Sequence, residues 1–449
     1  MSEIIKIKKG LSIKLQGEAD RTISSLDSTK YALKPTDFIG VFPKLNVKEG
    51  DTVKAGSPVF FDKYRDNIQF TSPVSGTITE IKRGAKRVLL EIRIEADGAN
   101  DFVDFGATNP ANLDREAIVE KLLKSGLWST IRQRPYSVIA DPAQSPKSIF
   151  ISAFDNGPLA ADYDFILHGK GEEFQAGLDA LAKLTNGKIH LNLHKHDTQT
   201  KVFHLAKNVQ INKFDGKYPS CLIGTQIAAI DPINKGDLVW TVNIQDVLTI
   251  GNLFLKGQYL PEKLFAVGGS EVLKPRYYRA KVGVTVQDIV SNNVTEGNLR
   301  YISGNPLTGT KIESNGYIGF YDNQLSVIPE GDYSQFVGWI TPNLDKFSFY
   351  RSMFSWLMPK KAFRLDTNLN GGVRAFVMTG QFEKVFPFDI YPMQLIKAVM
   401  GQDIDAMENL GIYEVAAEDF ALIEFISTSK IDVQSIVAEG LEFLRKEMS

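Results

Sequence analysis

The chain has 449 residues, with 51 basic and 53 acidic side chains and a formal net charge of −2. This length predicts about two to four domains, and the balanced charge gives no sign of a nucleic-acid-binding surface. No apolar run approaches the ~18 residues that a membrane-spanning helix needs, and the first residues lack the pattern of a signal peptide, so we expect a cytoplasmic or peripheral membrane protein.

Residues 36–95 predict short strands separated by tight turns. Segments 39–56 and 70–81 share one pattern, in which glycine-containing turns divide apolar strand positions. This pattern resembles the biotinyl/lipoyl-carrier fold, a flattened sandwich of two half-motifs. Lys63 lies near the expected hairpin tip, but neither carrier context surrounds it. We therefore expect a structural module without an attached acyl group.

Four basic residues, Lys82, Arg83, Lys86 and Arg87, surround Gly84 and form the densest basic patch of the sequence. A glycine between two strand patterns predicts a hairpin tip. The patch is either a solvated turn or a surface that contacts a partner subunit. Both interpretations stay open at the level of the sequence.

A strand–helix–strand pattern follows the first module. A helix is predicted over 114–123, ending at Gly126. Buried strands at 148–153 and 188–193 enclose a predicted helix over 174–184, and a further strand at 239–242 leads into a helix at 244–248. This order predicts a parallel α/β unit.

Cys221 is the only cysteine of the chain, and it lies in the apolar run 221–224. A disulfide within one chain needs two thiols, and an iron–sulfur cluster normally needs about four thiolates. We therefore expect neither group within this chain alone. An apolar run of this kind favours a buried, inert thiol.

The last third of the chain changes character twice. Residues 259–310 are rich in strands, at 264–269, 277–286 and 300–304, with a short helix start at 287–290, and this order suits a small β-grasp domain. Helices are predicted at 393–400, 404–410, 420–426 and 433–448. The last helix has an apolar stripe, which favours the core over subunit docking. The stripe consists of Val433, Ile436, Val437, Leu441 and Leu444.

Motifs for catalysis are missing from the sequence. It has no glycine-rich loop of the dinucleotide or P-loop type and no nucleophile elbow. The nearest glycine cluster, 168–173, opens a predicted helix, but Glu172 and Glu173 would repel a phosphate there. We therefore expect no catalytic residue in this chain.

Three histidines, His190, His194 and His196, share one face of a predicted strand. Together with Asp197, the last two have side chains that can ligate a divalent metal. An exposed strand end that carries such residues without function is the alternative. The sequence leaves this question open.

Motifs spread in order over the whole chain resemble one known family. The similarity lies in segments 72–76, 82–89, 155–162, 204–210, 245–251, 302–309, 327–331, 336–340, 369–375 and 386–392. The family is NqrA, one of the subunits of the bacterial sodium-translocating NADH:quinone oxidoreductase. The resemblance implies a peripheral subunit on the cytoplasmic face of the bacterial inner membrane, bound to other subunits that include integral membrane proteins.

The resemblance also implies how the redox work is divided. The complex passes electrons from NADH through flavins and iron–sulfur centres to quinone and exports sodium ions. Those cofactors belong to other subunits, and none is expected on this chain. Quinone is expected nearby, while its type and any contact with this subunit stay open.

The family's architecture matches the predicted elements as an α/β and α+β multidomain protein. It implies a biotinyl/lipoyl-carrier-like sandwich (1–100), a Rossmann-like α/β domain (101–258), a β-grasp domain of the SLBB type (259–312) and a C-terminal part ending in helices (313–449). A free-standing SLBB or carrier-like module that binds a small ligand, and an independent cofactor enzyme, are the alternatives.

Arg374 closes the glycine-rich stretch 370–374, which belongs to one of these motifs. We expect it to contribute to a subunit contact. An arginine that anchors the turn internally is the alternative.

Overall fold

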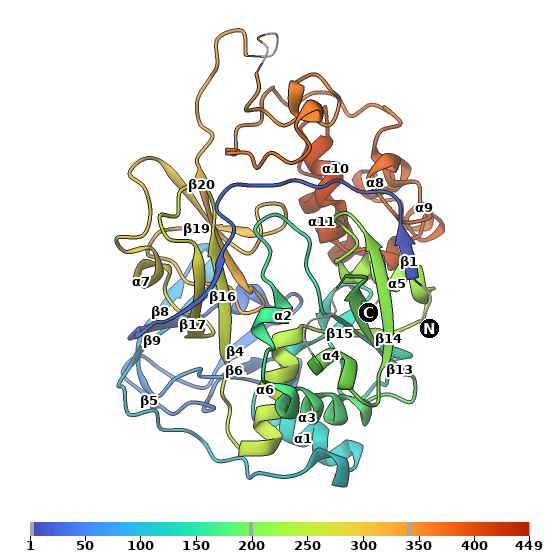
Figure 1. The fold of residues 1–449 in the computed structure, drawn as a ribbon. Coiled ribbons are helices and arrows are strands. Elements are labelled where there is room, and N and C mark those ends of the chain that lie inside the picture. The colour runs from blue at the N-terminus through green and yellow to red at the C-terminus, as the bar shows by residue number, and fades with distance from the viewer. Residues whose placement is uncertain (1–3, 197–200, 339–340, 342, 449) are drawn as a thin grey trace.

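The computed structural model describes residues 4–196, 201–338, 341 and 343–448 (Figure 1). The first three residues, Asp197 and residues 339–340 of one motif lie outside this description. The described residues form four sheets with helices around them, a mixed α/β multidomain architecture as predicted. Among these residues, no helix is long and apolar enough to cross a bilayer.

A sandwich of two small sheets forms from residues 30–96. One sheet has the order β3-β9-β8-β5 and the other β4-β6-β7. Alternating burial along the strands places Val53, Val59 and Ile78 in the core between them, as the valine and isoleucine spacing requires. The strands are β3 (Lys30–Leu33), β4 (Pro43–Leu45), β5 (Thr52–Val53), β6 (Pro58–Asp62), β7 (Arg65–Thr71), β8 (Gly76–Arg83) and β9 (Leu89–Ala96).

A seven-stranded sheet occupies the centre of the molecule, with the order β1-β14-β13-β12-β15-β10-β11. The first five strands run parallel, whereas β10 and β11 are antiparallel. The strands are β1 (Ile4–Ile7), β10 (Ile131–Arg134), β11 (Val138–Ile139), β12 (Ser148–Ser152), β13 (Lys188–His194), β14 (Gln210–Gly216) and β15 (Val239–Val242).

Helices cover both faces of this sheet, as expected of a parallel arrangement. Ile149 and Ile151 of β12 share a hydrophobic cluster with α3 (Gly171–Ala182) and α6 (Ile244–Lys256). Phe150, which points to the other face, shares a second cluster with α5 (Ile223–Ile230). The predicted strand–helix–strand unit is confirmed, although α3 begins at Gly171 and not at Phe174.

A six-stranded sheet has the order β19-β18-β20-β16-β17-β2, and α7 (Val286–Val290) contributes to its core. The predicted strand 277–286 is too long, because the chain turns at Gly283 with φ +76°. The strands are β2 (Asp20–Ser25), β16 (Glu262–Gly268), β17 (Arg276–Lys281), β18 (Leu299–Ser303), β19 (Thr310–Ile312) and β20 (Gln324–Pro329).

The N-terminal segment crosses between sheets. Strand β1 pairs with β14 of the seven-stranded sheet, and β2 pairs with β17 of the six-stranded sheet. Both strands fall within the predicted carrier-like limits 1–100, yet neither lies in the sandwich. The dark blue trace in Figure 1 spans the two larger sheets.

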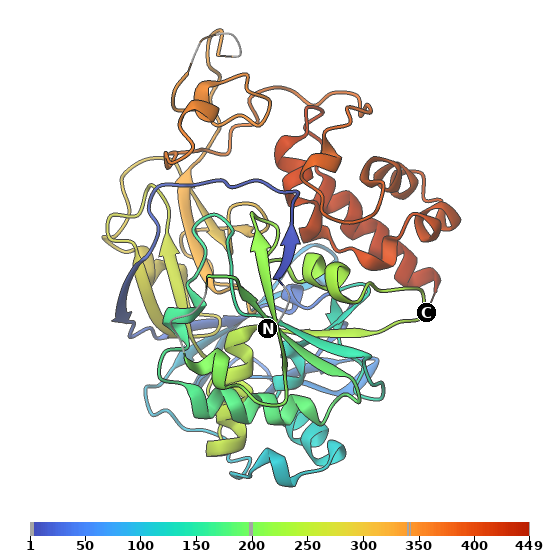
Figure 2. The same ribbon diagram turned by 45° about the vertical axis from the view of Figure 1, so that its right-hand side comes forward.

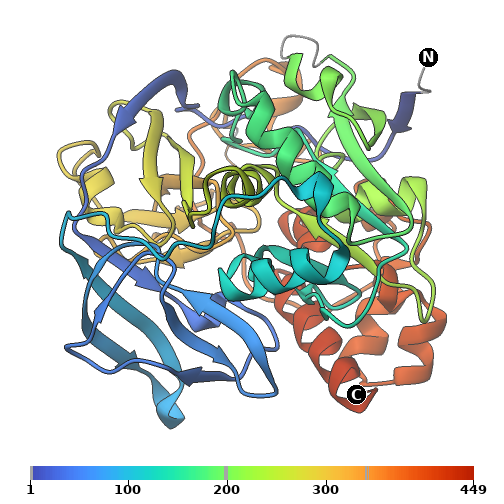
Figure 3. The same cartoon turned by 90° about the horizontal axis from the view of Figure 1, so that it is seen from below.

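The C-terminal helices pack on the remaining face of the central sheet, and Figure 3 shows them in red beside the green α/β part. Val433, Val437 and Leu444 of the last helix are fully buried, so its stripe is core, as predicted. The remaining helices are α1 (Arg115–Lys124), α2 (Tyr163–Ile166), α4 (Lys201–Leu205), α8 (Pro392–Met400), α9 (Ile404–Asn409), α10 (Ala421–Ile426) and α11 (Val433–Glu447).

Candidate docking surface

The basic patch lies at the tip of the hairpin formed by β8 and β9, where the sequence places it. A short 3-10 helix, Ala85–Arg87, closes the turn. Lys82, Arg83, Lys86 and Arg87 are all exposed. Lys82 lies 3.8 Å from Glu91, and Arg83 donates to the carbonyl oxygen of Arg87 at 3.2 Å. The patch is therefore a solvated turn in this chain, and its role toward a partner stays a prediction.

Arg374 lies on an exposed turn that is held by backbone contacts. Its backbone N–H donates to the carbonyl oxygen of Ser429 at 2.9 Å, and the Ser429 hydroxyl donates to the carbonyl oxygen of Ala375 at 2.9 Å. Asn370 and Gly371 supply the positive φ values of the turn. Within the described part of the chain, the guanidinium of Arg374 has no hydrogen bond or ion pair, so its side chain does not anchor the turn.

Arg374 belongs to a larger apolar surface that the sequence reasoning missed. We call the described residues from 331 to 380 the arm; it projects beyond the sheets and is orange in Figures 1 and 2. It carries half of the large apolar side chains that the described residues expose. These are Tyr333, Phe336, Val337, Leu344, Tyr350, Phe354, Trp356, Leu357, Leu369, Val373, Val377 and Met378.

A soluble monomer seldom exposes so many apolar side chains in one region, so the arm is the best candidate for a docking surface. A sequence signal was available, because aromatic residues crowd segment 347–356 without helical or strand spacing. Such a segment has apolar side chains but no regular element that would bury them.

The predicted histidine face is real, but its members have different surroundings. The His190 ring stacks on Phe150 at 4.5 Å, and its Nδ1 lies 3.2 Å from the amide nitrogen of Asn212. Burial, with a smaller effect of the Lys188 charge, lowers the pKa of His190. The His194 ring lies 5.4 Å from that of His196. Among the described residues, which exclude Asp197, no group of three His, Cys, Asp or Glu side chains can hold a metal.

Cys221 is buried, as predicted, next to the buried carboxylate of Asp155. The thiol donates to Asp155 Oδ1 at 3.3 Å, and this oxygen also accepts from the backbone N–H of Gly157 at 2.8 Å. Burial raises the pKa of Asp155 and raises that of Cys221 well above its usual range. A thiol kept protonated in this way is a poor nucleophile and a poor metal ligand.

Asp155 follows β12, the strand at which the sheet order reverses. Ligands of open α/β sheets often bind at this point. Here the chain's own loop occupies it: the Asn156 amide donates to the Gly216 carbonyl oxygen at 3.1 Å, and the Gln324 amide donates to that of Pro158 at 3.3 Å. The local polar groups therefore bond to one another and leave no open nucleotide site.

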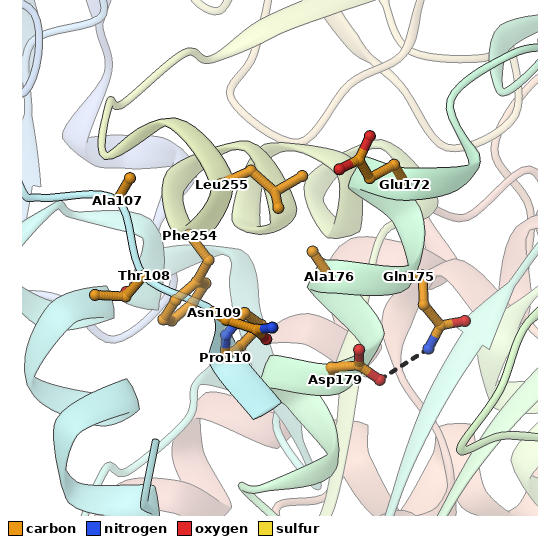
Figure 4. Close-up of a pocket in the computed structure, with 10 residues that line it drawn as sticks. All are labelled: Ala107, Thr108, Asn109, Pro110, Glu172, Gln175, Ala176, Asp179, Phe254 and Leu255. Carbon is orange, nitrogen blue, oxygen red and sulfur yellow. Dashed lines mark hydrogen bonds between the residues drawn. The ribbon is translucent and has the colours of Figure 1, made fainter. Parts of the chain in front are cut away.

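A cavity of about 580 Å³ lies between segment 107–110 and the helices α3 and α6 (Figure 4). Two carboxylates, those of Glu172 and Asp179, line it. Asp179 accepts from the amides of Gln175 at 2.8 Å and Asn208 at 2.9 Å. The acidic lining opposes a phosphate ligand, in agreement with the interpretation of segment 168–173.

Comparison with known proteins covers nearly the whole chain. Three family models match: "NqrA N-terminal barrel-sandwich hybrid domain" at residues 5–97, "NqrA second alpha/beta domain" at 113–259 and "NQRA C-terminal domain" at 264–314. A relative from Neisseria meningitidis serogroup B (strain ATCC BAA-335 / MC58) is 38% identical over 449 residues, covering 99% of this chain and 100% of the relative.

Two further relatives behave alike. One from Marinomonas sp. (strain MWYL1) is 36% identical, covering 98% of this chain and 99% of its own, and one from Vibrio anguillarum is 36% identical, covering 99% and 100%. All three are named as Na(+)-translocating NADH-quinone reductase subunits of the NqrA type. Among solved structures, an NAD+-reducing [NiFe]-hydrogenase matches with a TM-score of 0.39 and 13% identity, covering 75% of this chain and 62% of that one.

Proposed function

The chain belongs to the NqrA family of Na+-translocating NADH-quinone reductase subunits, and from this premise we propose that it is a peripheral subunit of that enzyme. It supports the reduction of quinone by NADH that is coupled to sodium export, on the cytoplasmic face of the bacterial inner membrane. The observation that carries this proposal is an identity of 36–38% that extends over nearly the full length of both chains.

The partner subunits, including integral membrane subunits, supply the NADH site, the flavins and the iron–sulfur centres. Cys221 is the chain's single thiol, and it is buried against Asp155. A cluster needs about four thiolates, so this chain cannot ligate one by itself. Whether quinone touches this subunit belongs to the same proposal and is decided by a structure with quinone bound.

Finer fold assignments complete the proposal. We assign the sandwich to the biotinyl/lipoyl-carrier type, the seven-stranded sheet to the Rossmann-like type and the six-stranded sheet to the SLBB β-grasp type. The reversal of strand order at β12 and the helices on both faces support the second assignment. The limits 1–100, 101–258, 259–312 and 313–449 describe these domains, with residues 4–25 crossing into the two larger sheets.

Affinity purification of the tagged, full-length chain from native membranes tests the assignment. We expect integral membrane subunits to co-purify and the eluate to reduce quinone with NADH in a sodium-dependent manner. A soluble monomer without such partners would instead favour a free-standing SLBB or carrier-like module that binds a small ligand.

Arg374→Ala tests the docking surface. We expect this change to weaken the association with partner subunits by about 30-fold, since a central interface arginine commonly contributes roughly 2 kcal/mol. The melting temperature of the chain should stay unchanged, because the side chain is exposed and bonds to no described residue. Recovery of partner subunits by affinity purification, after titration with salt, measures the effect.

Two variants accompany this test. Lys188→Ala removes an exposed cation far from the arm in the sequence and should leave recovery unchanged. A variant with alanine at Lys82, Arg83, Lys86 and Arg87 asks whether the hairpin tip also contacts a partner. Wild-type recovery with Arg374→Ala would remove this residue from the interface.

A further inference from the structure

The outer part of the arm, residues 343–361, turns apolar side chains away from the protein. We call this segment the tip. Its 3-10 helix, Phe354–Leu357, presents Phe354, Trp356 and Leu357 to solvent with exposed fractions of 39%, 50% and 58%. Tyr350, at 40%, lies at the start of the same turn. Four large apolar side chains are therefore gathered over a short stretch of chain.

The tip is attached to the protein core, so this exposure is part of the fold. The Phe347 ring packs against the rings of Phe363 at 5.7 Å and Phe425 at 5.9 Å. The Tyr350 hydroxyl donates to the carbonyl oxygen of Ile426 at 2.6 Å. These contacts hold one side of the tip against α10 and leave the 3-10 helix on the outside.

The backbone of the turn largely satisfies its own hydrogen bonds. The N–H of Met358 donates to the Ser355 carbonyl oxygen, and the N–H of Lys361 donates to that of Met358, both at 3.0 Å. The buried Ser355 hydroxyl accepts from the N–H of Ser348 at 3.1 Å. Backbone that is already bonded can leave water at a lower free-energy cost than unpaired backbone.

The charge of the tip differs from that of the whole chain. Residues 343–361 contain four basic side chains and one acidic side chain, whereas the chain as a whole has a net charge of −2. The acidic residue, Asp345, is paired with Lys361 at 2.6 Å. The Arg351 guanidinium lies 5.5 Å from the centre of the Trp356 ring, and Lys360 is exposed. Cations therefore flank the exposed apolar turn.

We propose that the tip is a membrane anchor, which places Phe354, Trp356 and Leu357 in the interfacial region of an anionic bilayer. Aromatic and leucine side chains partition into this region, and lysine and arginine beside them are attracted to anionic headgroups. The inference goes beyond the proposed function, which requires contact with partner subunits but no contact between this chain and lipid.

The shape and charge of the tip favour lipid over a partner protein. A protein partner must offer a pocket matched to each projecting side chain, whereas a fluid interface accommodates a convex turn without one. The tip projects from the molecule in two views (Figures 1 and 2). An anionic surface also complements the net positive charge of residues 343–361.

Vesicle flotation of the purified full-length chain tests the proposal. We expect binding to vesicles of phosphatidylcholine with phosphatidylglycerol, little binding to pure phosphatidylcholine, and release as salt rises. Trp356→Ser/Leu357→Ser should lower the partition coefficient at least about ten-fold. Arg351→Glu/Lys360→Glu should lower it about five-fold or more for each cation.

Leu205→Ser/Tyr391→Ser is the matched control, because it removes two apolar side chains that are 70% and 68% exposed outside the arm. It should bind like the wild type. Failure of the wild type to float with anionic vesicles, or equal flotation of the tip variants, would overturn the anchor. If the tip variants lose partner subunits while the wild type ignores vesicles, the tip contacts protein, and the proposed function still stands.

Discussion

Arg134→Ala is expected to lower the free energy of unfolding by about 3–5 kcal/mol. Arg134 ends β10, is 2% exposed, and forms ion pairs with Asp419 at 2.9 Å and with Glu418 at 2.6 Å. The Asp419 side chain is fully buried. Removal of the guanidinium leaves this carboxylate in the protein interior without a counter-charge. Urea denaturation of the full-length variant measures the loss.

The loss should depend on pH. Burial raises the pKa of Asp419, and the nearby Arg134 charge opposes that shift. Without Arg134 the pKa of the folded state rises further above that of the unfolded state, so the variant loses stability as pH rises through this range. The deficit relative to the wild type should therefore be smaller at pH 5 than at pH 7.

A surface pair provides the control for Arg134. Lys124→Ala removes an ion pair with Glu120 at 2.5 Å in which both side chains are more than 60% exposed. Exposed pairs of this kind contribute roughly 0–1 kcal/mol. An Arg134→Ala loss no larger than that of Lys124→Ala would show that the buried pair does not stabilise the seam between the central sheet and the C-terminal helices.

Lys263→Met is expected to cost a similar amount, about 3–5 kcal/mol, at a different seam. Lys263 lies on β16 of the six-stranded sheet and Asp246 on α6, and their side chains are 1% and 3% exposed. The ammonium lies 3.0 Å from Asp246 Oδ1 and donates to the Phe320 carbonyl oxygen at 3.0 Å. Burial raises the pKa of Asp246, and the Lys263 charge lowers it, so loss of the cation isolates the carboxylate.

The double variant Lys263→Met/Asp246→Leu separates charge from packing. Replacement of both members of a buried pair by apolar groups is often neutral or stabilising, so we expect recovery to within about 1–2 kcal/mol of the wild type. A double-mutant cycle in urea gives the coupling free energy. Losses that simply add would show that the two charges do not act as a pair. Lys82→Met, at the exposed pair with Glu91, is the matched control.

Local patterns predicted the regular elements well, because side-chain periodicity and caps act over a few residues. The predicted strand 239–242 coincides with β15, and Asp114 caps α1 by accepting from the N–H of Ala117. The apolar stripe of α11 was recognised as core for the same reason. Errors occurred at ends, as at Gly171 and Gly283, where no strong periodic signal marks the boundary.

The candidate surface shows what short-range patterns miss. Arg374 and the hairpin cations could be named from motifs and composition, and the structure places all of them on the exterior. The apolar side chains around Trp356 were not identified as exposed, because exposure depends on which distant segments cover a residue. Here α10 covers Phe347 and Tyr350 but leaves Trp356 open.

By itself, then, the sequence determined the family, the order of strands and helices, the scarcity of thiols and the buried state of Cys221. Only the tertiary structure decided that β1 and β2 leave the sandwich for the two larger sheets. It alone paired Arg134 with Asp419 across 285 positions and left the arm uncovered. The physical reason is range: helix and turn preferences are local, whereas strand partners, desolvation and burial depend on contacts between residues far apart in the chain.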